Sequence, residues 1–146
     1  MSQEIIKKAT EIVAANTVKN GTFNNEICNL SLIDEDGCPT TSVLTPAKSD
    51  GIETVYLCTM LDSNAPRRIA KNNRAGVSFT SAEYCVNLVG EIEVITEQII
   101  KSEIWYDGLA HHFPDGATDL NYCVLKFTTK RYKLFVDWQE VEGRLE

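Results

Sequence analysis

The chain has 146 residues, and its 21 acidic side chains outnumber the 14 basic ones, which gives a formal charge of −7 and a pI near 4.9. This length is typical of one compact domain with a core of its own. The negative charge argues against a protein that coats DNA or RNA, because such proteins bind phosphates through many basic groups. A local basic patch can still hold a small phosphate group.

The sequence has no apolar run near the ~20 residues that span a bilayer, and no signal peptide is visible at its start. We therefore expect a cytoplasmic protein that binds neither a membrane nor nucleic acid. The five cysteines are an odd number and form no Cys-x-x-Cys pair. They are predicted to be reduced thiols on core strands, since apolar or β-branched neighbours flank Cys28, Cys58, Cys85 and Cys123.

The first half of the chain predicts one helix and three strands. Apolar residues at helical spacing predict an amphipathic helix over residues 3–16, with Asn20-Gly21 in its end region. From Glu26 the pattern changes to alternation, which is typical of strands. Strands are predicted at 28–32, 40–45 and 54–59, with turns at 34–37 and 48–51 between them.

The second half predicts a short helix that begins near Pro66, with Ser63 or Asn64 as its cap. Strands at 76–80 and 85–94 follow, and then a helix capped by Thr96 that includes Trp105. Two more strands, 122–128 and 132–136, are joined by a predicted turn at 129–131. Seven strands with few helices predict an antiparallel barrel with peripheral helices.

Common catalytic motifs are absent: the sequence has no P-loop, no Gly-x-Gly-x-x-Gly, no Gly-x-Ser-x-Gly and no His-Glu-x-x-His. The two histidines, His111 and His112, are adjacent and would point in opposite directions on an extended loop, so we interpret them as a solvated pair. The run Asp34-Glu35-Asp36 lacks the rest of a calcium loop and is interpreted as a solvated turn. No catalytic side chain and no metal ligand is assigned.

The most informative stretch runs from Thr59 to Arg68, where a predicted strand ends and a helix begins. Helix N-termini present unpaired N–H groups and partial positive charge, which suit a phosphate. Arg67 and Arg68 would add forked donors. From these residues alone, an ordinary helix with solvated arginines is the alternative.

Several segments follow one another in a characteristic order. A helix, an Asp-Gly-x-Pro hairpin, the strand at 54–59 and the segment 63–79 come first. Trp105, the Phe-Pro-Asp-Gly run at 113–116, Asp119 and the stretches 122–125 and 133–138 come later. Over residues 3–140 this order resembles the FMN-binding split-barrel family of pyridoxamine 5'-phosphate oxidase, and within it the small general stress proteins.

The resemblance implies a mainly β fold (β+α), a six- to seven-stranded antiparallel split barrel with peripheral helices, in one domain over residues 1–146. It also implies a homodimer with one FMN at each end of the interface. The cofactor-binding residues that it indicates are Thr41, Ser42, Val43, Lys48, Thr59, Met60, Ser63, Asn64, Arg67, Arg68 and Trp138. Among these, Trp138 is expected beside the flavin ring, close to the partner subunit.

The sequence departs from the family pattern at the phosphate turn. Basic residues often found there are replaced by the turn at 63–66, and an arginine on the second strand is matched by Ser42. We therefore expect either that FMN binds more weakly than in the family, or that Arg67, Arg68 or Lys48 supplies the positive charge that the phosphate turn lacks. The oxidase also has a Trp followed six residues later by Arg-Leu-His. Trp138 is followed by Arg144-Leu145 without the His, so pyridoxamine-phosphate oxidation itself is not expected.

The leading hypothesis is a cytoplasmic homodimeric flavoprotein, an FMN-dependent oxidoreductase that acts on a small molecule. The alternative is a non-catalytic carrier or sensor of flavin, deazaflavin or haem in a stress response. A third reading is a dimeric scaffold with an empty pocket. The sequence identifies neither the substrate nor the electron donor.

Overall fold

The structure is a computed structural model that describes residues 2–18 and 26–145. These residues form three α-helices, two 3-10 helices and eight strands. The helices are α1 (Ser2–Ala15), α2 (Asn64–Lys71), α3 (Gln98–Ile104), η1 (Asp107–His111) and η2 (Gly116–Thr118). The strands are β1 (Cys28–Ile33), β2 (Pro39–Leu44), β3 (Pro46–Asp50), β4 (Thr54–Met60), β5 (Arg74–Thr80), β6 (Cys85–Ile95), β7 (Tyr122–Val136) and β8 (Gln139–Arg144).

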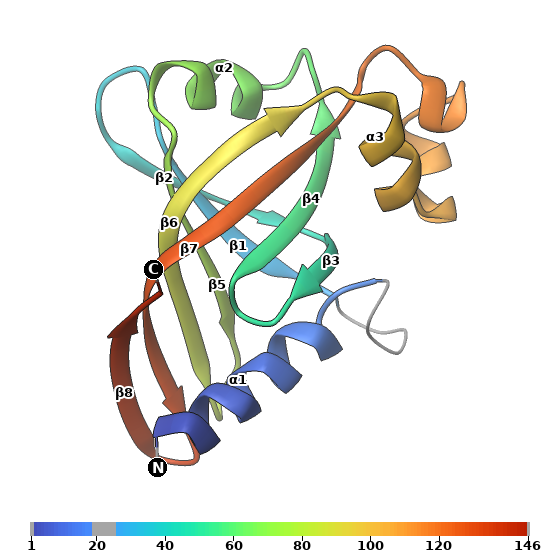
Figure 1. Ribbon diagram of the computed structural model, residues 1–146. Coiled ribbons are helices and arrows are strands. Elements are labelled where there is room, and N and C mark those ends of the chain that lie inside the picture. The colour runs from blue at the N-terminus through green and yellow to red at the C-terminus, as the bar shows by residue number, and fades with distance from the viewer. Residues whose placement is uncertain (1, 19–25, 146) are drawn as a thin grey trace.

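The strands form one antiparallel sheet in the order β2-β1-β5-β6-β7-β4-β3, and β8 pairs with β7. Figure 1 shows β6 and β7 as long, bent strands around which the sheet curls, with α2 and α3 near one end and α1 crossing near the other. The predicted mainly β split barrel with peripheral helices is therefore confirmed. No helix in the described part of the chain is long and apolar enough to cross a membrane.

The strand β7 is continuous, so the predicted turn at 129–131 is wrong. Its first half pairs with β4 and its second half with β8, while β6 pairs with both halves. Thr129 joins the halves: its amide donates to the Glu53 carbonyl at 2.8 Å and its hydroxyl to the Ile52 carbonyl at 2.6 Å. The three polar residues 129–131 predicted a turn, but Thr129 is buried and both its amide and its hydroxyl are hydrogen-bonded.

Two strands were not predicted. Residues 46–50 form β3, and the turn expected at 48–51 begins later, where Gly51 adopts φ +57°. The strand β8 is half charged and mostly exposed, and its only apolar side chain is Val141, so it carries no alternating apolar pattern. It pairs with β7 over residues 131–136.

The main apolar core lies inside the curled sheet and is covered by α1. The helix buries Ile5, Ala9 and Val13, as its predicted spacing requires, and an ion pair from Lys8 to Asp137 joins it to the β7–β8 turn. The Asn20-Gly21 pair expected near its end lies outside the described residues. The largest fully buried side chains of this core include Phe79, Phe127, Leu57, Leu88, Ile92, Leu125 and Leu134.

A second apolar cluster lies under α3. Trp105 packs edge-on against Tyr122, with ring centroids 5.3 Å apart. The Tyr122 hydroxyl donates to the Lys101 carbonyl at 2.8 Å, and the buried Lys101 ammonium donates to the Asp119 carbonyl at 3.0 Å. These contacts join α3 to the segment that leads into β7. Helix α3 begins without the predicted Thr96 cap, because its N-cap residue is Glu97.

All five cysteines are free thiols, but they are not all in the core. Cys28 and Cys123 are buried, Cys58 and Cys85 are half-buried, and Cys38 is exposed. The prediction of a core position is therefore wrong for Cys38, which follows the turn at Gly37 instead of lying inside a strand. Burial raises the pKa of Cys28 to about 12 and that of Cys123 to about 11.

Candidate functional site

A cavity of about 220 Å³ lies between the β1–β2 hairpin, the end of β4 and the start of α2. One wall is apolar, because alternation along the hairpin turns Leu30, Leu32 and Leu44 toward it. The rest of the lining is polar or belongs to the start of the helix: Thr40, Ser42, Thr59, Ser63, Asn64, Ala65 and Arg68. A ligand here would meet an apolar surface on one side and hydrogen-bonding groups on the other.

Five of the eleven residues expected to bind a cofactor line this one cavity, namely Ser42, Thr59, Ser63, Asn64 and Arg68. They come from β2, β4 and α2, which are separate in the sequence. The sheet order places β1 and β2 at one side and β4 near the other, and the curl of the sheet brings them together.

The other expected residues lie outside this lining. Thr41 and Val43 alternate with the lining residues of β2, so they lie on the opposite face of that strand, and Val43 is 62% exposed. Lys48 lies on β3 opposite Tyr56. Met60 ends β4 and contributes its carbonyl as an acceptor for Ser63.

Ser63 occupies the N-cap position of α2, but its side chain does not cap the helix, contrary to prediction. Its hydroxyl donates to the Met60 carbonyl at 2.6 Å. The Thr59 hydroxyl lies 3.1 Å from Ser63 Oγ and must be the donor of that pair, because the single hydroxyl proton of Ser63 is already used. The start of α2 is therefore left without a side-chain cap, and the hydroxyl oxygens remain available as acceptors at the cavity.

The two arginines of α2 bind the same carboxylate. Arg67 donates from Nε to Glu35 Oε2 at 2.9 Å, and its Nη2 forms an ion pair with the same oxygen at 2.7 Å. Arg68 donates from Nε to Glu35 Oε1 at 3.2 Å and from Nη1 to Thr40 Oγ1 at 3.3 Å. Hydrogen bonds from Arg67 are the largest cause that lowers the pKa of Glu35 to about 2. The interpretation of the acidic turn as merely solvated is therefore wrong for Glu35.

The turn that carries Glu35 is held by its own neighbour. Asp34 Oδ1 accepts the backbone N–H groups of Asp36 and Cys38, both at 2.9 Å. Gly37 closes the turn with φ +80°, which glycine adopts without steric cost. The hairpin itself thus fixes the backbone from which the Glu35 side chain reaches the two arginines.

Glu35 and Thr40 are the polar residues that sequence reasoning missed at this site. Glu35 is 32 positions before Arg67, and no local pattern links the two. Thr40 could have been found, because it alternates with Ser42 along β2 and must share its face.

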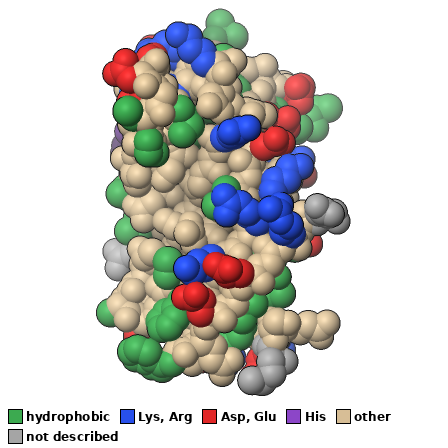
Figure 2. Space-filling view, turned by 90° about the vertical axis from the view of Figure 1, so that its left-hand side faces the viewer, with side chains coloured by type: hydrophobic (Ala, Val, Ile, Leu, Met, Phe, Trp, Pro, Cys, Tyr) green, Lys and Arg blue, Asp and Glu red, His purple; other side chains and the backbone are tan. Residues whose placement is uncertain are grey.

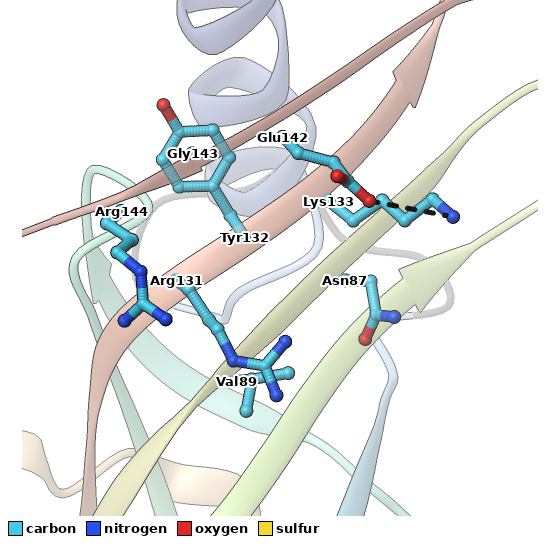
Figure 3. A pocket seen from close by; sticks show the side chains of 8 residues that line it. All are labelled: Asn87, Val89, Arg131, Tyr132, Lys133, Glu142, Gly143 and Arg144. Atoms are coloured by element: carbon cyan, nitrogen blue, oxygen red, sulfur yellow. Dashed lines mark ion pairs between the residues drawn. The ribbon is translucent and has the colours of Figure 1, made fainter.

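A second cavity, of about 380 Å³, lies on the sheet face opposite the core, between β6, β7 and β8. Figure 3 shows Arg131 and Arg144 side by side at its edge, with Lys133 and Glu142 close together farther along. Lys133 pairs with Glu140 at 3.6 Å and with Glu142 at 3.8 Å.

Arg131 and Arg144 face each other across the β7–β8 ladder. In the described part of the chain neither guanidinium has an acidic partner. Figure 2 shows Lys and Arg side chains gathered over the middle of one face of the molecule, although the chain as a whole is acidic. Like charges that face each other across two strands are unfavourable unless an anion lies near.

The β7–β8 turn presents an unusual aromatic residue. Asp137 and Trp138 have φ values of 54° and 63°, in the left-handed region that residues other than glycine rarely adopt. The Trp138 side chain is 86% exposed and lies edge-on to Phe135 at 5.7 Å. Figure 1 shows this turn and α2 at opposite ends of the molecule, so Trp138 cannot reach the cavity of its own chain.

Within residues 2–18 and 26–145, no three His, Cys, Asp or Glu side chains are close enough to share a metal ion. Both His111 and His112 are exposed, away from either cavity.

Comparison with known proteins identifies relatives by family and by fold. The family described as "Pyridoxamine 5'-phosphate oxidase like" matches residues 14–143. No curated protein matches the chain. A Clostridium acetobutylicum protein related to general stress protein 26 of B. subtilis is similar with a TM-score of 0.83 at 22% identity, over 99% of this chain and 97% of that one.

Two further solved structures share the fold. General stress protein 26 from Bacillus anthracis has a TM-score of 0.76 at 18% identity, over 97% of this chain and 98% of its own. A heme binding protein from Mycobacterium smegmatis has a TM-score of 0.68 at 17% identity, over 96% of this chain and 57% of its own. At these identities the likeness shows the fold.

Proposed function

Because the chain belongs to the pyridoxamine 5'-phosphate oxidase-like family, we propose that it is an FMN-binding flavoprotein and an oxidoreductase that acts on a small molecule. The observation that carries the proposal is the cavity at α2, where Ser42, Thr59, Ser63, Asn64 and Arg68 surround one space. The family resemblance indicates the same five residues as cofactor-binding.

The chemistry of the cavity suits the phosphate end of FMN. The start of α2 has no side-chain cap, and Asn64 and Ala65 line the space, so their amide groups and the partial positive charge of the helix lie at the cavity. Arg68 adds a charged donor, and the hydroxyls of Thr59 and Ser63 lie at the same end. The apolar wall formed by the hairpin offers a surface to a flat ring.

A single chain supplies only part of the site. The cavity of about 220 Å³ is smaller than the ~300–1,000 Å³ typical of small-molecule sites. We propose that a second copy of the chain supplies the other wall, so that the active form is a homodimer. Exposed Val43 and Trp138 would lose their water contact there, and the Arg131–Arg144 face would bring positive charge toward the ligand.

When FMN is bound, it supplies the hydride or electron transfer. Arg68 and the start of α2 would hold the phosphate, and Leu30, Leu32 and Leu44 would offer their apolar surface to the ring. The second copy would exclude water from the ring. The missing His after Arg144-Leu145 argues for a substrate other than pyridoxamine phosphate.

Haem is the second cofactor to consider, because one protein of the same fold is a heme binding protein. Haem iron takes an axial ligand such as His, Cys, Met or Tyr. None of these residue types lines the cavity at α2 in the described structure. The donor set that one chain supplies therefore favours flavin.

The test is to purify the protein, record its absorption spectrum and identify the cofactor released on denaturation. Flavin bands, released FMN and a light-scattering mass of twice 16.3 kDa are expected. A Soret band would identify haem instead, and a protein that binds neither cofactor on titration would be an empty scaffold. Reduction of the bound flavin by a nicotinamide cofactor would separate an enzyme from a carrier.

A further inference from the structure

We infer that Glu35 determines which anionic groups the cavity at α2 accepts, because its carboxylate competes with a ligand for the arginine pair. The inference rests on the proposed phosphate site at the start of α2. The β1–β2 turn would thereby take part in ligand specificity.

The first step is that Glu35 already forms ion pairs with both arginines. Both carboxylate oxygens are engaged, Oε2 by Arg67 and Oε1 by Arg68, at 2.7–3.2 Å. Asp34 fixes the backbone of the turn independently of any ligand, and the carboxylate at its end is bound by the two arginines, so a ligand that takes the arginines must break these contacts. Two positive charges are thereby reduced to a net charge of one.

The second step concerns Arg68, which lines the cavity while Arg67 does not. A guanidinium has five N–H donors. One of those on Arg68 is used by Glu35 and one by Thr40. A phosphate bound by the remaining donors would lie across a single guanidinium from the Glu35 carboxylate, and the two anions would repel each other.

The third step is charge matching. A phosphate monoester carries about −1.5 to −2 at neutral pH, whereas Glu35, Arg67 and Arg68 together carry +1. A singly charged group, such as a phosphodiester or a carboxylate, is matched by these three side chains. A phosphate monoester needs more positive charge than they supply, which the start of α2 and, in the proposed dimer, the Arg131–Arg144 face of a second copy would add.

The test is Glu35→Gln, which keeps a hydrogen-bond acceptor and removes the charge. FMN should bind about tenfold tighter, the size of one charge-assisted contact, and riboflavin should bind as it does to wild type. Asp36→Asn is the matched control, since it removes one charge from the same turn at a carboxylate that contacts neither arginine in the described structure. Glu35→Ala should change FMN affinity in the same direction as Glu35→Gln.

Inorganic phosphate provides a readout that does not depend on flavin. The Nε–H resonances of Arg67 and Arg68 should shift at lower phosphate concentration in Glu35→Gln than in wild type. If no variant binds flavin but phosphate still binds tighter to Glu35→Gln, the proposed function fails and the role of Glu35 stands. If FMN and phosphate bind no tighter to Glu35→Gln, or Asp36→Asn tightens them equally, the role of Glu35 is overturned.

Discussion

Gly90 on β6 lies directly against the backbone of Thr128 on β7, so closely that a Cβ atom at Gly90 would overlap the Thr128 carbonyl group. The two strands shift register between Val89 and Gly90. This close approach lets β7 pass β6 without a break. It also allows the next residue, Thr129, to bond to Ile52 and Glu53.

Replacing Gly90 should therefore destabilise the fold. Gly90→Ala places a methyl group against main-chain atoms that cannot rotate away, and we expect a loss of about 3 kcal/mol or more in the free energy of unfolding. Gly76→Ala is the control, because a Cβ there meets only ordinary contacts at 3.6–3.7 Å. Denaturant unfolding of both variants measures the difference, and equal stabilities would contradict this account of Gly90.

Arg68 and Arg67 should differ in their effect on cofactor binding. Arg68→Ala removes a charged donor from the cavity lining, so FMN should bind about ten- to a hundredfold more weakly. Riboflavin should be nearly unaffected, since it has no phosphate. Arg67→Ala should change FMN affinity less, because Arg67 lies outside the lining. Titration of each variant with FMN and with riboflavin measures the difference, and Lys71→Ala is the control on the same helix. If Arg67→Ala loses more FMN affinity than Arg68→Ala does, the phosphate lies elsewhere.

Trp138 should act on the dimer rather than on the stability of its own chain. It is 86% exposed, so Trp138→Ala should change the free energy of unfolding of one chain by no more than about 0.5 kcal/mol. Flavin affinity should fall and flavin fluorescence should rise, because a stacked indole quenches it. Trp105→Phe, in the cluster under α3, should leave the fluorescence unchanged. Identical flavin binding in wild type and Trp138→Ala would assign the residue to the surface alone.

The cysteine thiols should differ in the rate at which they react with a thiol reagent. Cys38 is exposed and should react quickly with a thiol reagent at pH 8. Cys28 and Cys123 should react slowly, because burial blocks access and raises their pKa, so that little thiolate is present at that pH. Mass spectrometry of the labelled native protein identifies the sites. Cys38→Ser should remove the fast phase, and a fast phase that survives this change would contradict the assignment.

Glu35 should make the fold sensitive to acid. Its pKa is lowered from 4.5 to about 2 in the folded chain, so the stability that it contributes is present above pH 4.5 and is lost as the pH falls toward 2. Glu35→Gln should therefore lose less stability than wild type between these pH values. Unfolding midpoints across this range test the sign. Asp36→Asn should follow wild type, and a parallel decline in all three proteins would exclude the effect.

Local patterns predicted the parts of the fold that are built locally. The helix α1 and the strands β1, β4, β5 and β6 were predicted from periodicity that depends on one buried face. The wrong turn at 129–131 and the missed strand β8 have the same cause, because tertiary contacts decide both structures. Thr129 continues a strand because the Ile52 carbonyl accepts its hydroxyl, and β8 forms because β7 offers it an edge for pairing. At the site, the polar residues at the start of α2 were visible in the sequence. Glu35 was not, because only the curl of the sheet brings it to Arg67.

The place of β7 in the sheet has a consequence for synthesis on the ribosome. It lies between β6 and β4, so until residues 122–136 have emerged, both of those strands have an unpaired edge. The nascent chain therefore carries two incomplete pieces of sheet, one ending in β6 and one in β4, that cannot yet be joined. Open apolar edges of this kind are targets for chaperones and for aggregation. Slow translation before residue 122 would lengthen that exposed interval.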